Sequence, residues 1–158
     1  MPTKRMREYL NKNDVRYVTV GHSPAYTAEA VAASAHIPAK EMAKTVMIEI
    51  DGMPAMAVIP ASFHADLEQL RAALDARHIS LLREKDFKDR FPDCEPGAMP
   101  PFGNLYGMPV FVSESLAEDE YIAFSAGSHN EVVLMTYADY ERLVAPRIVK
   151  FSAETLVL

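Results

Sequence analysis

The chain has 158 residues, of which 49% are hydrophobic and 24% charged, with 11 prolines and 6 glycines. This length and composition are typical of one globular domain, so we expect a single domain over residues 1–158. The formal net charge of −6 argues against a protein that binds nucleic acid over its whole surface, but it is compatible with a local contact to an RNA end. The single cysteine, Cys94, excludes an internal disulfide bond.

The charge and hydropathy patterns also predict where the protein works. Six charged side chains within the first fifteen residues leave no apolar stretch for a signal peptide. The uncharged stretch at residues 52–65 is interrupted by two prolines, and it is shorter than the ~20 apolar residues of a membrane helix. We therefore expect a cytoplasmic protein without a membrane-spanning segment or a membrane partner.

Apolar spacing and capping residues predict the first elements of the chain. Thr3 is the expected N-cap of a helix that ends near Asn13. The alternation over residues 16–20 predicts a strand. Thr27 is the expected N-cap of an alanine-rich helix that ends at His36, before a proline.

The clearest local signal is a β-hairpin. Residues 45–51 alternate apolar and polar side chains, Asp51-Gly52 is typical of a two-residue turn, and residues 53–59 return as the second strand.

The rest of the chain mixes helices and strands around one irregular segment. Residues 92–109 hold five prolines and three glycines, which predicts a loop with a fixed path. The strands come as hairpins and meanders, so we expect an α+β domain with a mixed, largely antiparallel central sheet flanked by helices, rather than a doubly wound parallel sheet. The other predicted elements are helices over residues 66–77, 84–91 and 137–144, and strands over residues 79–82, 110–112, 121–125, 131–136 and near Ile148.

Motifs for cofactors, metals and nucleophilic catalysis are missing. The sequence contains no GxGxxG, GxxxxGK[ST], HExxH, CxxC or GxSxG. The five histidines lie far apart without ligand-like pairs, so we predict neither a cofactor nor a metal site. Cys94 lies between Asp93 and Glu95, whose negative charge should raise the thiol pKa and make it a poor nucleophile.

Three places remain as candidates for chemistry. Lys44 stands at the start of a predicted strand, where its ammonium could bind an anion or a carbonyl oxygen or could simply be solvated. The loop at residues 97–103 combines glycine and proline, so its backbone N–H groups could stabilise an oxyanion, or it could be only a tight connection. The turn at residues 124–130 carries His129, which could orient a ligand or lie on plain surface.

These places occur together, in this order and spacing, in one known family. The sequence resembles the YbaK/prolyl-tRNA synthetase-associated domain family, which comprises freestanding trans-editing deacylases related to the editing insertion of bacterial prolyl-tRNA synthetases. The resemblance covers roughly residues 15–145. It is carried by His22-Ser23-Pro24-Ala25, Ala43-Lys44-Thr45-Val46, Gly97-Ala98-Met99-Pro100-Pro101-Phe102-Gly103 with Met108-Pro109, and Phe124-Ser125-Ala126-Gly127.

The resemblance implies the family's editing-domain fold and hydrolysis of the ester that joins a wrong small amino acid to the 3′ end of a tRNA, with tRNA(Pro) the expected tRNA. It also implies catalytic roles for Lys44, which would position the ester, and for Gly97, whose loop backbone would contact the aminoacyl carbonyl. Relatives recruit a water and the terminal adenosine's 2′-hydroxyl in place of a side-chain base. The implied partners are the aminoacyl-tRNA 3′ end and an aminoacyl-tRNA synthetase. The implied substrate-binding residues are His22, Thr45, Pro101, Phe102, Gly103, Ser125, Gly127 and His129.

The amino acid and the reaction itself stay open at this level. The cysteine-specific branch has a tyrosine shortly before the histidine that matches His22, whereas this chain has Val20-Gly21. This difference argues against cysteine specificity and leaves alanine, serine, threonine or another small residue open. Two alternatives compete with a deacylase. One is a non-catalytic module of the same fold that binds an aminoacyl-adenosine or a synthetase, and the other is a fold-only relative with an unrelated small substrate.

Overall fold

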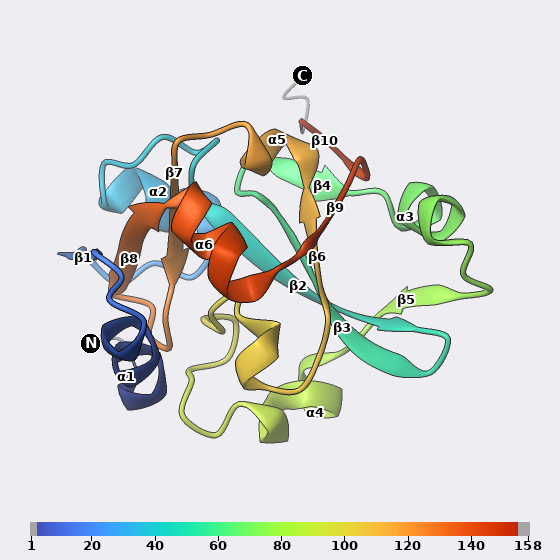
Figure 1. Cartoon of the computed structure of the whole chain (residues 1–158), viewed down its shortest axis with the longest axis horizontal. Helices are drawn as coiled ribbons and strands as arrows, with labels where there is room; N and C mark the ends of the chain where they lie inside the picture. The colour runs from blue at the N-terminus through green and yellow to red at the C-terminus, as the bar shows by residue number, and fades with distance from the viewer. Residues whose placement is uncertain (1–2, 155–158) are drawn as a thin grey trace.

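The computed structural model describes residues 3–154, which form an α+β fold with a mixed sheet (Figure 1). The strands are β1 (Val18–Gly21), β2 (Ala43–Ile50), β3 (Met53–Pro60), β4 (Phe63–Ala65), β5 (Ile79–Leu81), β6 (Val110–Ser113), β7 (Tyr121–Ser125), β8 (Glu131–Thr136), β9 (Arg147–Val149) and β10 (Ser152–Glu154). The α-helices are α1 (Lys4–Lys12), α2 (Ala28–Ser34), α3 (Leu67–Leu74), α4 (Glu84–Phe87), α5 (Glu114–Ala117) and α6 (Tyr137–Val144), and two 3₁₀ turns, η1 (Lys88–Arg90) and η2 (Gly103–Leu105), complete the set.

The described strands belong to three sheets rather than to the one central sheet expected from the sequence. The largest has the order β5-β2-β3-β6-β9, in which β5, β2 and β3 pair antiparallel and β3, β6 and β9 pair parallel. An antiparallel sheet β1-β8-β7 lies to one side, and β4 pairs with β10. A parallel bridge between Met42 and Ala123 connects β2 with β7. The mixed, mainly antiparallel character of the fold is confirmed.

The β2–β3 hairpin forms as predicted. Asp51 and Gly52 have φ angles of 47° and 87°, which is the left-handed pair of a two-residue turn that matches the twist of the strands. Ile50 pairs directly with Met53 across this turn. The Asp51 carboxylate also accepts hydrogen bonds from the backbone N–H groups of Arg77 and His78, so one side chain fixes both the turn and the start of β5.

The hairpin separates two apolar cores because strand side chains alternate between faces. Ile48 and Ala57 point to the side covered by Leu70 of α3. Met47 and Met56 point to the opposite side, where the core includes residues of α1, α6 and the loop after η1. β3 is therefore buried over most of its length, as expected for a strand covered on both faces.

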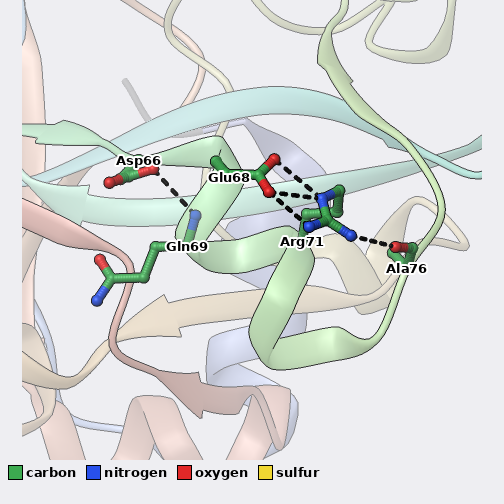
Figure 2. Close-up of polar contacts among 5 residues, drawn as sticks. All are labelled: Asp66, Glu68, Gln69, Arg71 and Ala76. Carbon is green, nitrogen blue, oxygen red and sulfur yellow. Dashed lines mark hydrogen bonds and ion pairs between the residues drawn. The ribbon is translucent and has the colours of Figure 1, made fainter.

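Capping side chains fix the helices near these cores. Thr3 accepts a hydrogen bond from the Met6 N–H and caps α1, as predicted. Figure 2 shows α3, where Asp66 accepts from the Gln69 N–H at 3.0 Å and Arg71 donates both to Glu68 and, at 3.1 Å, to the carbonyl of Ala76. These contacts anchor both ends of α3 beside the large sheet.

Several short elements differ from the prediction. β4, α5 and β10 were not predicted, since three or four residues carry too little periodicity to be recognised. The helix expected over residues 84–91 ends at Phe87 and continues as the 3₁₀ turn η1. Residues 92–109 are irregular apart from η2, as expected. No helix within residues 3–154 is long and apolar enough to cross a membrane.

Candidate active site

A cavity of about 610 Å³ opens between the N-terminal turn of α2, the start of β2 and the loops that follow Pro96 and β7. Its inner wall contains the apolar side chains of Val31, Met42, Ala61 and Met99. Five of the ten residues selected from the sequence line it: Lys44, Thr45, Gly97, Ser125 and His129. Three segments that are distant in the sequence thus meet at one cavity.

Lys44 supplies the cavity with a cation. Its neighbours Met42 and Ala43 are buried, so the strand start is fixed, and the half-buried ammonium donates a hydrogen bond to the Phe63 carbonyl at 2.8 Å. Burial lowers the pKa of Lys44, and the negative charge of Glu29 partly opposes this shift. The ammonium is therefore held in place by a neutral acceptor, which leaves its charge available to a ligand.

The loop after Pro96 contributes Gly97 and Met99 to the lining of the cavity. Gly97 has a φ of +83°, a conformation that favours glycine. The N–H groups of Gly97 and Met99 donate no hydrogen bond to any other residue of the described chain, although both residues line the cavity. The loop is fixed by its other groups, because the Ala98 carbonyl accepts from the Gly127 N–H at 2.8 Å.

His129 is fixed by polar contacts on the same loop. Its backbone N–H donates to the Glu95 carboxylate at 2.9 Å, and its Nε2 lies 2.6 Å from the Pro96 carbonyl oxygen. Because a carbonyl only accepts, Nε2 is the donor in this contact. The ring also packs on Tyr26, with centroids 5.1 Å apart.

The other five predicted residues lie outside the cavity walls, and the structure shows them in packing or backbone roles. Phe102 is completely buried between aromatic rings, including that of Tyr140, and the Pro101 carbonyl accepts from the Tyr140 hydroxyl at 2.8 Å. A Cβ on Gly103 would lie 2.5 Å from the Met108 carbonyl oxygen. These three residues therefore fix the conformation of the loop over residues 97–103 through contacts outside the cavity lining.

Gly127 and His22 flank the same region. Gly127 has a φ of +113°, and a Cβ there would clash with the Thr3 side chain, so this glycine permits the close contact between the turn and the N-terminus of α1. His22 donates its backbone N–H to Asn130 at 2.9 Å, and its Nδ1 lies 2.7 Å from the Ser23 carbonyl oxygen. Its buried Nε2 has no hydrogen-bond partner within residues 3–154.

Tyr26 and Glu29 are among the lining residues that sequence reasoning missed. Tyr26 is 77% exposed and Glu29 is also exposed, yet both line the cavity. The sequence around Thr27 indicates only a capped helix, and a single aromatic or acidic residue at a helix start carries no periodic signal. The signal that could have indicated this segment is the matched motif that ends with Pro24 and Ala25, directly before Tyr26.

Cys94 is not suited to act as a nucleophile, although the main reason differs from the predicted one. Burial is the main cause that raises the pKa of Cys94 to about 11. A hydrogen bond from Tyr106 lowers this pKa, and the negative charge of Asp93 raises it by a smaller amount. The thiol is therefore protonated at neutral pH. Within residues 3–154, no group of three or more His, Cys, Asp or Glu side chains could hold a metal ion.

Comparison with known proteins identifies the family. The sequence matches the model of the aminoacyl-tRNA editing domain over residues 22–143. The chain belongs to this family. It is accordingly an aminoacyl-tRNA deacylase, and the resemblance seen in the sequence is confirmed. The matched range contains Lys44, the loop after Pro96 and His129, which are the three places that the cavity brings together.

Individual relatives of this editing domain cover nearly the whole chain. The multifunctional Ser/Thr-tRNA deacylase ProXp-y of Escherichia coli (strain K12) is 27% identical over 154 residues, which is 94% of this chain and 91% of that protein. The crystal structure of hypothetical protein APE2540 has a TM-score of 0.84 at 14% identity and covers 95% of this chain and 100% of its own. A candidate trans-editing enzyme for prolyl-tRNA synthetase has a TM-score of 0.79 at 14% identity, with coverages of 95% and 96%. These structural similarities show the shared fold.

Proposed function

We propose that this editing domain removes serine, threonine or another small wrong amino acid from tRNA in trans, with tRNA(Pro) the first candidate tRNA. The observation that carries the proposal is the meeting of Lys44, Gly97 and His129 at one cavity of about 610 Å³. The Escherichia coli relative acts on Ser/Thr-tRNA, which supports serine and threonine as the first amino acids to test. Thr45 and Ser125 line the cavity and offer hydroxyl groups that can pair with a substrate hydroxyl.

The proposed mechanism relies on positioning and on backbone donors. The Lys44 ammonium holds the tRNA end and aligns the ester. The unpaired N–H groups of Gly97 and Met99 donate hydrogen bonds to the oxyanion that forms when water attacks the carbonyl. The ester C–O bond then breaks, which releases the free amino acid and the tRNA with its 3′-hydroxyl. His129 packs beside Gly97 and limits the room for the substrate side chain.

The proposed mechanism uses no side chain of the cavity as a general base, because the substrate's own 2′-hydroxyl orients the water. Lys44 is an ammonium, and Glu29 is exposed at the rim. An ester is more reactive than an amide, so alignment, one cation and two oxyanion donors are sufficient in principle.

Deacylation assays test this function directly. Wild-type protein and Lys44→Ala would be incubated with tRNA(Pro) charged with Ala, Cys, Ser, Thr or Pro, and with Ser and Thr on their own tRNAs. We expect loss of the seryl or threonyl ester by the wild type, sparing of Pro-tRNA, and at least a hundredfold slower hydrolysis by Lys44→Ala, of the order seen when a key electrostatic group is removed. Lys40→Ala, at an exposed lysine outside the cavity, serves as the matched control.

Two results would overturn the proposal. Stability of every ester in the presence of wild-type protein would exclude these substrates, and tight binding of a non-hydrolysable aminoacyl-adenosine analogue would then indicate a binding module. A large drop in the Tm of Lys44→Ala would instead assign Lys44 a structural role.

A further inference from the structure

The substrate of a deacylase carries a charge that the mechanism above does not use. An aminoacyl ester has a free α-amino group, which is protonated near neutral pH. A site that recognises amino acids gains affinity and selectivity when a carboxylate pairs with this ammonium, because charge-assisted hydrogen bonds are the stronger ones. The question is whether the cavity offers such a carboxylate.

Of the described residues that line the cavity, Glu29 is the one with an acidic side chain. It lies in the first turn of α2, whose start is fixed by the Thr27 side chain, which accepts from the Ala30 N–H at 3.1 Å. Its carboxylate forms no hydrogen bond and no ion pair with another residue of the described 3–154 range. The carboxylate is therefore available to a ligand.

Glu29 also lies close enough to act on the catalytic lysine. Its negative charge is felt at Lys44 across the cavity, yet the ammonium donates to the Phe63 carbonyl instead of pairing with the carboxylate. The cavity thus presents one cation and one anion that do not neutralise each other. This arrangement is complementary to the end of an aminoacyl-tRNA, which carries the α-ammonium on one side of the ester and the anionic backbone phosphate on the other.

From this pairing of charges we propose that Glu29 binds the α-ammonium of the aminoacyl group and selects free amino acid esters over esters without that charge. The assignment rests on the proposed function of the cavity and adds a positioning residue to it. Esters with a blocked amine, such as those of N-acylated or peptidyl-tRNA, would meet an unpaired carboxylate and be disfavoured. The domain would then spare elongating peptidyl-tRNA because its blocked amine carries no charge.

The test uses a substrate from which only the charge has been removed. Nitrous acid converts Ser-tRNA into glyceryl-tRNA, in which a hydroxyl replaces the α-amine and the ester is kept. Wild-type protein, Glu29→Gln and a control, Glu114→Gln, would be assayed on both substrates. Glu114 is also an exposed glutamate in the first turn of a helix, but it lies outside the cavity, so the control removes the same charge from the chain.

We expect Glu29→Gln to lower kcat/KM on Ser-tRNA by about tenfold, as for the loss of one hydrogen bond to a charged group. On glyceryl-tRNA, we expect Glu29→Gln and the wild type to be equal, and Glu114→Gln to match the wild type on both substrates. A purely structural role of Glu29 would lower both rates by the same factor, and this result would overturn the assignment. So would an unchanged rate of Glu29→Gln on Ser-tRNA.

A binding measurement separates this proposal from the proposed function. Calorimetry would compare a 3′-seryl-amide of adenosine, which cannot be deacylated, with its glyceryl counterpart. A wild-type preference for the amine form that Glu29→Gln loses supports the assignment, even if the wild type hydrolyses no ester and the deacylase function fails. Equal affinity of the wild type for the two analogues overturns the assignment, even if Ser-tRNA is deacylated.

Discussion

At the scale of single residues, the cavity combines a cation with backbone N–H groups that are unpaired within the described chain. The Lys44 ammonium is held by a carbonyl rather than by a carboxylate, and the N–H groups of Gly97 and Met99 lack acceptors within the described chain. Backbone donors that are unused within the described chain can bind a ligand without loss of an internal hydrogen bond, and a lysine with a shifted pKa at the same cavity is typical of a functional site. Substitutions there should separate activity from stability.

Gly97 provides one such test. In Gly97→Ala, the new Cβ would be 3.5 Å from His129 Cε1, which is ordinary contact, but the φ of +83° strains any side chain and shifts the N–H. We expect kcat to fall by about tenfold or more, because a displaced oxyanion donor loses most of its effect, together with a drop in Tm of roughly 2–4 °C.

Gly107→Ala is the matched control for this variant. Gly107 also has a positive φ, +71°, with open space around the new Cβ, and it lies outside the cavity. We expect a similar change in Tm, measured by calorimetry, without a change in deacylation rate. Equal activity of the two variants would remove the Gly97 backbone from the mechanism.

The residues of the site were only partly predictable from the sequence. Lys44 and Gly97 could be found because a motif at fixed spacing carried them. Within the same motif, Phe102 and Gly103 pack in the core, and a motif does not distinguish residues that touch a ligand from those that shape the loop. Glu29 reaches the cavity only through the placement of α2 beside β2, which no local pattern encodes.

At the scale of elements, local signals predicted the fold well where one segment carried its own turn or cap. The β2–β3 hairpin and the capped starts of α1 and α2 formed as expected. The division into three sheets could not be predicted, because it depends on distant pairs such as β4 with β10 and on strands of three residues.

The hairpin turn gives a prediction about pH. The pKa of the Asp51 carboxyl is lowered, first by the backbone hydrogen bond from His78 and then by that from Arg77. A lowered folded-state pKa means that the carboxylate stabilises the protein above its ordinary pKa and that this stabilisation is lost as the pH falls through the lowered value. Asp51→Asn keeps a residue that tolerates positive φ but removes the charge.

We therefore expect Asp51→Asn to lower the Tm by a few degrees at pH 7, and the difference from the wild type to shrink as the pH falls below the ordinary carboxyl range. Thermal unfolding followed by circular dichroism between pH 2 and 7 checks this outcome. Asp14→Asn is the control, because Asp14 also has a positive φ of 54° but its carboxylate accepts no hydrogen bond within the described chain. A Tm difference for Asp51→Asn that stays constant with pH would contradict the assigned role.

At the scale of the whole molecule, the charge distribution determines the electrostatic contribution to tRNA binding. The chain carries a net charge of −6, so its net charge does not favour long-range attraction to the tRNA body. Residues 4–16 are locally basic, with five Lys and Arg against two Asp and Glu, but α1 also packs Met6 and Leu10 into the core. The basic side chains of α1 are therefore either the solvated face of a helix that packs on the core or a binding surface for the acceptor stem of the tRNA. The dependence of the deacylation rate on salt distinguishes these two roles.

We expect recognition to be concentrated at the single-stranded 3′ end. Among the described residues that line the cavity, Lys44 is the one lysine or arginine. One such cation corresponds to about one or two neutralised phosphates. The expected slope of log kcat/KM against log salt is therefore about −0.7 to −1.4. Between 50 and 200 mM salt, kcat/KM should then fall only about three- to sevenfold.

The comparison substrate is a short aminoacylated oligonucleotide that ends in CCA, which should show the same slope as full-length tRNA. A much steeper slope for the full-length tRNA would instead mean that α1 contacts the acceptor stem, and a Lys4→Ala, Lys12→Ala double variant should then reduce that slope toward the value for the oligonucleotide.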